Sequence, residues 1–393
     1  MNNMMEPKIR FKGFEGEWKT PLFSEMVERI SASGQAGMLP GVEFEDIASG
    51  EGCFNKNIYQ KECHKYGKLF YEGDILFGKL RPYLKNIILA DFNGVAIGDF
   101  WVLRSRGLDE KYLYTLVNSE SFLKVANISS GSKMPRADWN LVSTTKFVVP
   151  SAKDEQKAIG KYFTSLDSQI SASTSRLASL KQMKAASLQA IFPQEGETVP
   201  KIRFKGFEGE WKKVKLSELY ERSSIKNDLS FGTDKIISVA NMYFIKNSRQ
   251  VDDDYLRSYN IMRLGDIAFE GNKSKNFAHG RLVENTIGDG IVSHVFIVMK
   301  PISKNYDLNF WKYYINNENI MGNILVRSTK SSTMMTDLVV DDFLKESILV
   351  PSYEEQIEIG KILTSLDRQI SLQSQRLEKL KQIKSACLDK IFV

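Results

Sequence analysis

The hydrophobic pattern is strongest in two stretches, Gln156 to Phe192 and Gln356 to Phe392, which lie 200 positions apart. In each stretch apolar residues recur in steps of three and four, which is typical of one narrow apolar stripe on an α-helix. The stripe residues are Ile159, Phe163, Leu166, Ile170, Leu177 and Leu180, then Ile359, Leu363, Leu366, Ile370, Leu377 and Leu380. Because a helix cannot bury such a stripe alone in water, we predict that the two helices pack together.

Polar residues interrupt both stripes at equivalent positions, Ser173 and Gln373. Polar residues at such positions fix the register of paired helices at some cost in stability. About 36 residues at roughly 1.5 Å each give a helix on the order of 50 Å long. The length of the pair, rather than any chemistry on it, is therefore its main expected contribution.

A second repeat precedes the first in each half of the chain. The segment PKIRFKGFEGEWK spans Pro7 to Lys19 and recurs unchanged from Pro200 to Lys212. Its glycines favour turns, and its aromatic residues can anchor an extended arm to a surface. Each half is thus predicted to consist of an arm, a variable domain and a long helix.

The segments between arm and helix mix short apolar runs with helical patches, so we predict two α+β domains. The expected strands lie within Asp74–Phe77, Asn86–Ala90, Phe100–Leu103, Ile291–Met299 and Ser347–Val350, and the expected helices within Asp109–Val125 and Leu308–Ile320. The predicted division is 1–150 for the first arm and domain, 151–193 for the first helix, 194–199 for a linker, 200–351 for the second arm and domain, and 352–393 for the second helix. The domains align only at landmarks such as GDIL and GDIA, with different loops between them.

Composition adds little to this picture. The chain has 393 residues, 42% of them hydrophobic and 26% charged, with a formal net charge of +6, which suits a polyanionic partner without requiring one. Cys53, Cys63 and Cys387 have spacings of neither a zinc site nor a disulfide framework, so we expect reduced thiols and a cytoplasmic protein. No apolar run has the length of a signal peptide core or a membrane span.

Two polar, basic loops recur in both halves and are the candidate DNA-binding sites. One follows the GDIL or GDIA strand, where cations and an aromatic residue can reach phosphates or base edges. The other carries small hydroxyl residues among cations before the last strand of each domain, a composition that suits phosphate contacts. The candidates are Lys79, Arg81, Tyr83, Lys85, Asn86, Ser132, Lys133 and Arg136 in the first half, and Lys273, Ser274, Lys275, Asn276, Arg281, Arg327, Ser328, Lys330 and Ser331 in the second. A purely solvated basic loop remains the alternative for each.

Patterns typical of catalysis are weak. Gly73 to Lys79 has the spacing of a phosphate-binding loop, but Leu80 stands where a hydroxyl should hold magnesium, and the middle residues favour a strand. His64, His279 and His294 have neither metal-ligand nor catalytic-triad spacing. No N-P-P-aromatic motif of an amino-methyltransferase occurs. We therefore predict no catalytic residues, no metal site and no cofactor site in this chain.

Four motifs together resemble the specificity subunit of type I restriction-modification systems. They are F-x-G-F-x-G-E-W at Phe11 to Trp18, GDILFGKLRPYLKN at Gly73 to Asn86, VPS-x-x-x-E-Q-x-x-I-G at Val149 to Gly160, and S-L-D-x-Q-I at Ser165 to Ile170 and again at Ser365 to Ile370. The resemblance covers essentially the whole chain. The second domain departs from it, since RSTKSSTMM at Arg327 lacks the proline of GSKMPR.

The resemblance implies two target recognition domains separated by an antiparallel two-helix coiled coil, with no catalysis in this subunit. It also implies double-stranded DNA as a partner, two modification subunits that use S-adenosylmethionine to methylate adenine, and two restriction subunits that use ATP and magnesium. Similar faces of DNA recur about every 34 to 36 Å, so a helix pair near 50 Å long can set two readers about one turn apart. We therefore expect a bipartite, asymmetric target with an unread gap.

Two other classes of function stay open at this point. A coiled-coil adaptor that bridges two proteins would bind DNA weakly and without sequence preference. An autonomous nuclease or methyltransferase would show activity as an isolated chain.

Overall fold

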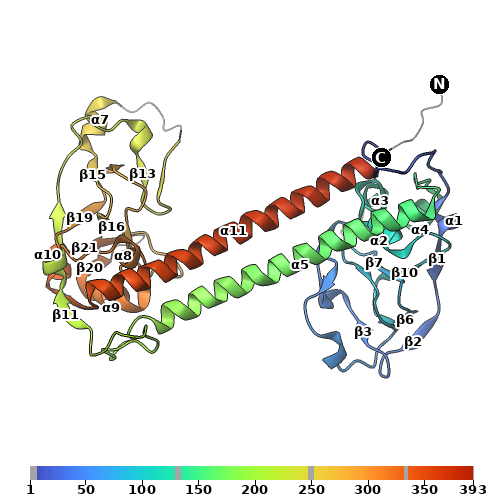
Figure 1. The fold of residues 1–393 in the computed structure, drawn as a ribbon, viewed down its shortest axis with the longest axis horizontal. Coiled ribbons are helices and arrows are strands. Elements are labelled where there is room, and N and C mark those ends of the chain that lie inside the picture. Colours follow the sequence, from blue (N-terminus) through green and yellow to red (C-terminus); the bar gives the residue numbers. More distant parts are fainter. Residues whose placement is uncertain (1–6, 129–133, 247–251, 332–334, 393) are drawn as a thin grey trace. The chain divides into compact units, whose positions relative to one another are not determined.

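The computed structural model describes residues 7–128, 134–246, 252–331 and 335–392. It forms two compact units, Met1–Leu177 with Gln373–Val393, and Ala178–Leu372. The long helices α5 (Lys153–Ala190) and α11 (Tyr353–Ile391) each contribute residues to both units. Each unit therefore contains one globular domain and part of each long helix (Figure 1).

Within each unit the two helices pack in antiparallel directions, as predicted. In the first unit Asp167 of α5 pairs with Lys384 of α11 at 2.5 Å, and Gln373 donates a hydrogen bond to the Ser173 carbonyl at 3.2 Å. In the second unit the equivalent pair, Lys184 and Asp367, also lies at 2.5 Å. The stripe residues are buried or half-buried, and both interrupting polar residues are buried in one layer.

Each of the two domains contains a four-stranded antiparallel sheet with the same strand arrangement, which we call the shared sheet. Its order is β1-β10-β7-β8 in the first unit and β12-β19-β16-β17 in the second. The strands are β1 (Val27–Ile30), β10 (Phe100–Ser105), β7 (Ile75–Gly78) and β8 (Ile87–Leu89), then β12 (Tyr220–Ser223), β19 (Ile297–Pro301), β16 (Ile267–Glu270) and β17 (Arg281–Glu284). The α+β class and the internal repeat are confirmed.

Alternate residues of this sheet are buried on opposite faces. On one face Ile75 and Phe77 join a core with the domain's helices, while on the other Leu76 joins a second core. In the second unit Ile267 and Ala268 divide in the same way. Both faces are covered, which explains why these strands read as continuous apolar runs.

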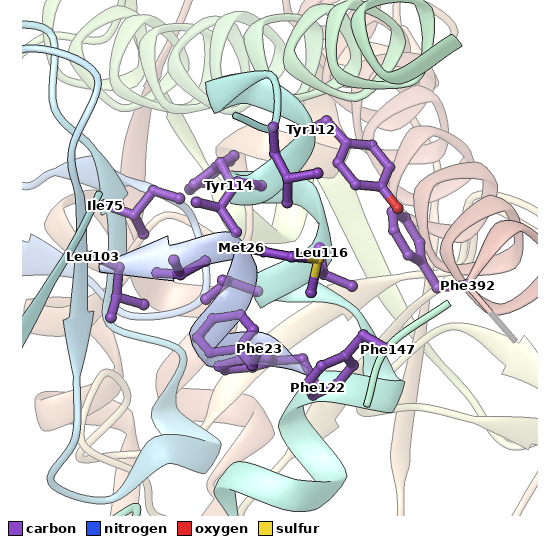
Figure 2. Packing of buried hydrophobic residues seen from close by; sticks show 14 of the residues in the cluster. Phe23, Met26, Ile75, Leu103, Tyr112, Tyr114, Leu116, Phe122, Phe147 and Phe392 are labelled. Atoms are coloured by element: carbon purple, nitrogen blue, oxygen red, sulfur yellow. The ribbon is translucent and has the colours of Figure 1, made fainter. Parts of the chain in front are cut away.

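Short helices cover the face of the sheet that is turned toward the long helices. They are α1 (Phe23–Met26), α2 (Glu110–Asn118), α3 (Glu120–Ala126) and α4 (Trp139–Thr144) in the first unit, and α6 (Leu216–Leu219), α8 (Leu308–Tyr314), α9 (Glu318–Ser328) and α10 (Val340–Lys345) in the second. Phe392, which directly follows α11, completes this core, and its ring lies 5.7 Å from the Tyr112 ring (Figure 2). In the second unit Phe192 occupies the equivalent place, 5.2 Å from Tyr314.

The E-Q-x-x-I-G motif holds each long helix to its domain. Gln156 accepts a hydrogen bond from the Asp109 amide at 3.0 Å, and Gln356 accepts one from the Asp307 amide at 3.3 Å. Gly160 is required by close approach, because a Cβ there would lie 2.6 Å from the Tyr112 amide nitrogen. This contact explains a glycine inside a long helix, where glycine otherwise lowers stability.

The repeated arms are held by equivalent, partly buried ion pairs. Arg10 makes two bonds to Glu155, at 2.7 and 2.8 Å, and Arg203 makes two to Glu355, at 2.8 and 2.7 Å. Trp18 is buried, as is its counterpart in the second arm. The predicted anchoring of each arm is therefore confirmed, with arginine as an additional anchor. A backbone bridge from Lys19 to Val149 continues the first arm, and strands β11 (Lys212–Lys215) and β22 (Ser347–Val350) pair at the same place in the second.

The two domains differ beyond the shared sheet. The first adds a four-stranded sheet of β2 (Ser33–Gln35), β6 (Tyr66–Phe70), β9 (Gly94–Ala96) and β3 (Gly41–Val42), and the pair β4 (Ile47–Ala48) with β5 (Cys53–Phe54). The second adds the pairs β15 (Asn260–Met262) with β18 (Gly290–Val292) and β13 (Ile237–Ser238) with β14 (Tyr243–Phe244), and helix α7 (Asp253–Ser258). We call these additions the outer lobes.

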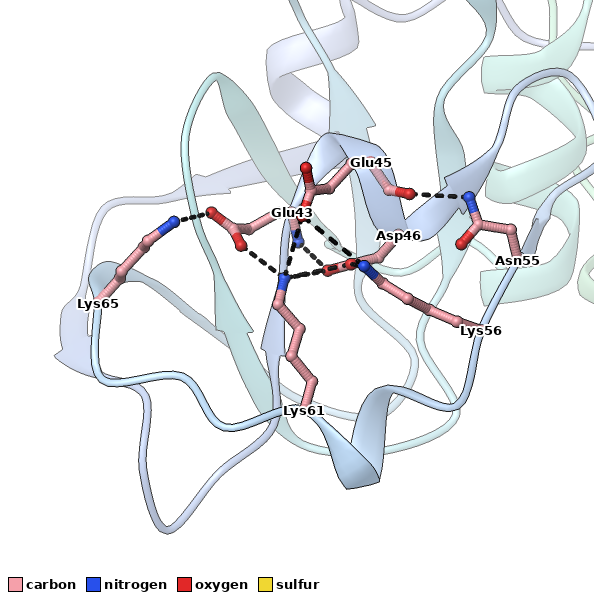
Figure 3. Close-up of polar contacts among 7 residues, drawn as sticks. All are labelled: Glu43, Glu45, Asp46, Asn55, Lys56, Lys61 and Lys65. Atoms are coloured by element: carbon pink, nitrogen blue, oxygen red, sulfur yellow. Dashed lines mark hydrogen bonds and ion pairs between the residues drawn. The ribbon is translucent and has the colours of Figure 1, made fainter.

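An ion-pair network holds part of the first outer lobe (Figure 3). Asp46 is fully buried and pairs with Lys56 at 2.7 Å and Lys61 at 2.9 Å, while Lys65 reaches Glu43 at 2.6 Å. Burial alone would raise the pKa of Asp46, but Lys56, Lys61 and a backbone hydrogen bond from Glu43 hold that pKa below its ordinary value. The lysines of this lobe therefore neutralise internal carboxylates.

Three predicted elements have different bounds in the structure. The predicted strand Ile291–Met299 is wrong as one element, because a turn with a hydrogen bond from Phe296 to Ser293 divides it between two sheets. The predicted helix Asp109–Val125 is broken at Ser119, whose hydroxyl accepts the Phe122 amide and caps a new helix. The predicted helix Leu308–Ile320 likewise ends at Tyr314, and α9 begins at Glu318.

Candidate nucleic-acid interface

The two candidate loops of the first domain lie side by side. At the end of β7, the Lys79 carbonyl accepts a hydrogen bond from the Ala137 amide, and the Arg81 amide donates to the Pro135 carbonyl at 2.8 Å. An antiparallel bridge joins Leu80 to Arg136 between them. We call this junction the first seam, residues 79–81 and 135–137.

The second domain joins its two candidate loops at the equivalent place. The Thr336 amide donates to the Gly271 carbonyl at 2.9 Å, and an antiparallel bridge joins Asn272 to Met335. This second seam comprises residues 271–272 and 335–336. Thr329–Ser331 (β20) and Thr336–Leu338 (β21) pair beside it. In the sequence the two loops of each domain are separate candidates, because no local pattern indicates that they pair.

An acidic residue that sequence reasoning missed lies at the first seam. Asp99 contacts the Lys79 ammonium at 3.2 Å and the Arg136 guanidinium at 3.1 Å, and its carbonyl accepts the Lys79 amide. Partial burial would raise the pKa of Asp99, but hydrogen bonds from Arg136 and Lys79 outweigh burial and hold that pKa below its ordinary value. The three side chains therefore form a charged cluster, which we call the Lys79–Asp99–Arg136 trio.

Several candidate side chains of the first domain face solvent. Arg81 and Lys85 have positive φ angles, 50° and 53°, and flank a 3-10 turn at Pro82–Leu84. Both are exposed, and so is Tyr83, with 56% of its surface accessible. Asn86 differs, because it is buried and its side-chain oxygen accepts the Ser49 hydroxyl at 2.7 Å. Ser132 and Lys133 lie outside the described residues.

The candidate residues of the second domain also divide into exposed side chains and side chains with internal partners. Lys273, Ser274, Lys275 and Asn276 are exposed around a turn in which Ser274 and Phe277 exchange backbone hydrogen bonds. Lys330 is exposed on β20, whose backbone also contains Ser331.

Three further candidates of that domain have internal partners. Arg281 pairs with Glu270 at 2.7 Å, and Arg327 binds both oxygens of Glu346 at 2.8 and 2.7 Å. Ser328 is buried and donates to the Ile324 carbonyl. Arg327 and Ser328 end helix α9 rather than opening a loop, so the predicted loop is shorter than expected.

Other kinds of site receive no support from the described geometry. Among the described residues, no group of three or more His, Cys, Asp or Glu side chains is placed to hold a metal ion. The segment Ile75–Gly78 is a strand, as its composition indicated, rather than a phosphate-binding loop. In the described part of the chain, no helix combines the length and apolar character that crossing a membrane requires.

Comparison with known proteins agrees with the sequence resemblance. Residues 208–382 match the type I restriction modification DNA specificity domain. The chain is 22% identical over 311 residues to the specificity subunit of the type I restriction enzyme MjaVIII of Methanocaldococcus jannaschii, covering 73% of this chain and 70% of that protein. It is 23% identical over 120 residues to the EcoDI specificity subunit of Escherichia coli, covering 29% of this chain and 27% of that one.

One solved structure shares the fold over nearly the whole length. The S subunit of a type I restriction-modification system from M. genitalium aligns with a TM-score of 0.60 at 14% identity, covering 99% of each chain. The matched domain and the two curated relatives show that this chain is similar to type I restriction-modification specificity subunits, and the solved S subunit has the same duplicated α+β fold.

Proposed function

We propose that this chain directs a type I complex to a bipartite, asymmetric DNA target with an unread gap. The observation that carries this proposal is one scaffold built twice with different outer parts. The same sheet, helix contacts and arm anchors occur in both units, whereas the outer lobes and the seam residues differ. Equal scaffolds with unlike outer parts suit two readers of two different half-sites.

Each seam is the proposed base-reading region of its domain. Exposed cations and hydroxyls near the seams, such as Arg81, Lys273 and Lys275, can contact phosphates, and side chains at the seam itself can reach base edges. The affinity for DNA should then fall steeply with salt concentration, because bound phosphates release counterions. Asn86 and Ser328 would contribute by supporting the loops from inside.

The repeated arms are the proposed docking surfaces for two copies of a modification subunit. Lys8, Ile9 and Lys12 of the first arm are exposed, and their counterparts Lys201, Ile202 and Lys205 are exposed in the second. Repeated surfaces can receive two identical partners equivalently. We propose that these partners bind S-adenosylmethionine and methylate adenine, that two restriction subunits supply ATP- and magnesium-dependent cleavage, and that this cytoplasmic chain is not itself catalytic.

The direct test is to co-express the chain with its modification subunit and to map methylated adenines on plasmid DNA. We expect two short specific parts of different sequence separated by unspecified base pairs. Methylation without sequence preference would instead favour the adaptor alternative, in which the domains bind proteins. Activity of the isolated chain with metal, ATP and S-adenosylmethionine would favour an enzyme.

The helix pair is the proposed ruler for the gap. Inserting four residues after Ser173 and four after Gln373 adds about one turn, or roughly 6 Å, to both helices. Base pairs are spaced by about 3.4 Å, so the gap should lengthen by one or two base pairs while both half-sites stay the same. The same methylation map measures this result. A four-residue insertion in the linker, after Gly196, serves as the control and should leave the gap unchanged; an unaltered gap in the helix variant would disprove the ruler.

A further inference from the structure

We propose that Asp99 determines the specificity of the first domain by positioning Lys79 and Arg136. In this proposal, the carboxylate holds both cations in one orientation, so that they are presented to base edges rather than to phosphates. The proposal rests on the DNA-reading function proposed above and names one residue that sets its selectivity.

The position of Asp99 suits this role because three separate segments meet there. Asp99 precedes β10, Lys79 follows β7, and Arg136 lies in the second candidate loop. The Asp99 carbonyl accepts the Lys79 amide at 2.9 Å, and its carboxylate contacts both cations. Asp99 therefore restrains both segments of the first seam.

The charges at the seam favour base edges over phosphates. A carboxylate between two cations repels phosphate oxygens and offsets one of the two positive charges. Arg136 contacts Asp99 through Nε and one terminal nitrogen, and about half of its side chain remains exposed. Its remaining N–H groups can donate to O6 and N7 of guanine, which is the commonest specific contact of arginine in the major groove.

The second domain shows that the fold does not require the trio. The register aligns Ile75 with Ile267 and Leu103 with Met299, which places Gly271, Val295 and Met335 at the positions of Lys79, Asp99 and Arg136. None of these three residues carries a charge, yet the second seam forms the same bridge. The charged trio is therefore a property of the first domain alone and not of the shared scaffold.

The test compares Asp99→Val and Asp99→Asn with the natural chain, each co-expressed with the modification subunit. Valine is the residue that the second domain has at this position, and asparagine keeps the shape of aspartate. We expect discrimination at one or two base pairs of a single half-site to fall by about tenfold or more, with the other half-site unchanged. We also expect DNA binding to become more salt-dependent, because Lys79 and Arg136 become available to phosphates.

Controls separate this outcome from general effects. Glu28→Gln removes another carboxylate of the same domain, 3.8 Å from Arg106, and should leave both half-sites unchanged. Asp99→Glu should retain most of the discrimination, and Arg136→Met should relax the same base pairs as Asp99→Val. Unchanged half-sites in both Asp99 variants would overturn the proposal, and so would failure of Asp99→Asn to fold. Absence of a two-part target for the natural chain would instead refute the proposed function.

Discussion

Replacing Phe192 with alanine is expected to destabilise the second unit by about 3 to 5 kcal/mol, the usual cost of deleting a buried aromatic ring. Phe192 is fully buried and lies 5.2 Å from the Tyr314 ring and 6.0 Å from the Phe310 ring. Phe392→Ala is the matched variant for the first unit, where Phe392 packs against Tyr112 and Phe163. Each helix end should therefore stabilise a different unit.

Hydrogen exchange followed by mass spectrometry can separate the two effects. Phe192→Ala should lower amide protection in β16 and leave β7 nearly unchanged, whereas Phe392→Ala should do the reverse. Met183→Ala, which removes a 55% exposed side chain from α5, the helix that precedes Phe192, is the control and should change neither. Loss of protection in the same strand for both phenylalanine variants would contradict the equivalent packing of the two helix ends.

Replacing Glu284 with leucine should make the second unit more stable, and increasingly so as pH rises. Glu284 is 2% exposed, the Tyr306 hydroxyl donates to one of its oxygens at 2.9 Å, and the other oxygen has no hydrogen-bond partner. Burial raises the pKa of Glu284 to about 9 despite the hydrogen bond from Tyr306. The register places Leu89 at the equivalent position of the first domain, so the scaffold accepts leucine there.

The direction of the pH effect follows from proton binding. Between pH 4.5, the ordinary value for glutamate, and about 9, the unfolded chain loses this proton while the folded chain keeps it. The contribution of Glu284 to the free energy of unfolding is therefore fully present below pH 4.5. It is lost as pH rises toward 9, by up to about 1.4 kcal/mol per pH unit.

Denaturant unfolding between pH 6 and 8 measures this difference. Glu284→Leu should remove most of the fall in the free energy of unfolding that Glu284 causes as pH rises. Glu284→Gln should remove the same pH dependence without adding an apolar side chain. An identical pH slope in the natural chain and both variants would show that Glu284 ionises normally in the fold.

The helices and the repeat could be predicted from the sequence because their signals are local or periodic. Stripe residues such as Ile159 and Ile359 recur at helical spacing, and the structure buries both. The interrupting residues Ser173 and Gln373 meet in one layer because equal positions in the two copies face each other in the antiparallel pair. The sequence also indicated the α+β class, since the apolar runs at Asp74–Phe77, Asn86–Ala90 and Phe100–Leu103 correspond to strands of the four-stranded sheet.

Local patterns did not indicate which distant segments would meet. The pairing of Leu80 with Arg136 and the position of Asp99 depend on backbone contacts across tens of residues, which no periodicity reveals. Asn86 looked accessible because it ends a polar run, but its side chain is directed inward and bonded to Ser49. The outer lobes were equally hidden, since all of their strands except β6 have only two or three residues and are too short for an alternation signal.

The most direct test of two unlike readers on one scaffold is a duplication of the first domain. In this variant, residues 7–150 replace residues 200–351, so that both long helices receive the same domain. Methylated adenines would be mapped after co-expression with the modification subunit. We expect both parts of the target to contain the bases that the first domain reads. A methylation pattern that retains the original second half-site would contradict the assignment of one half-site to each domain.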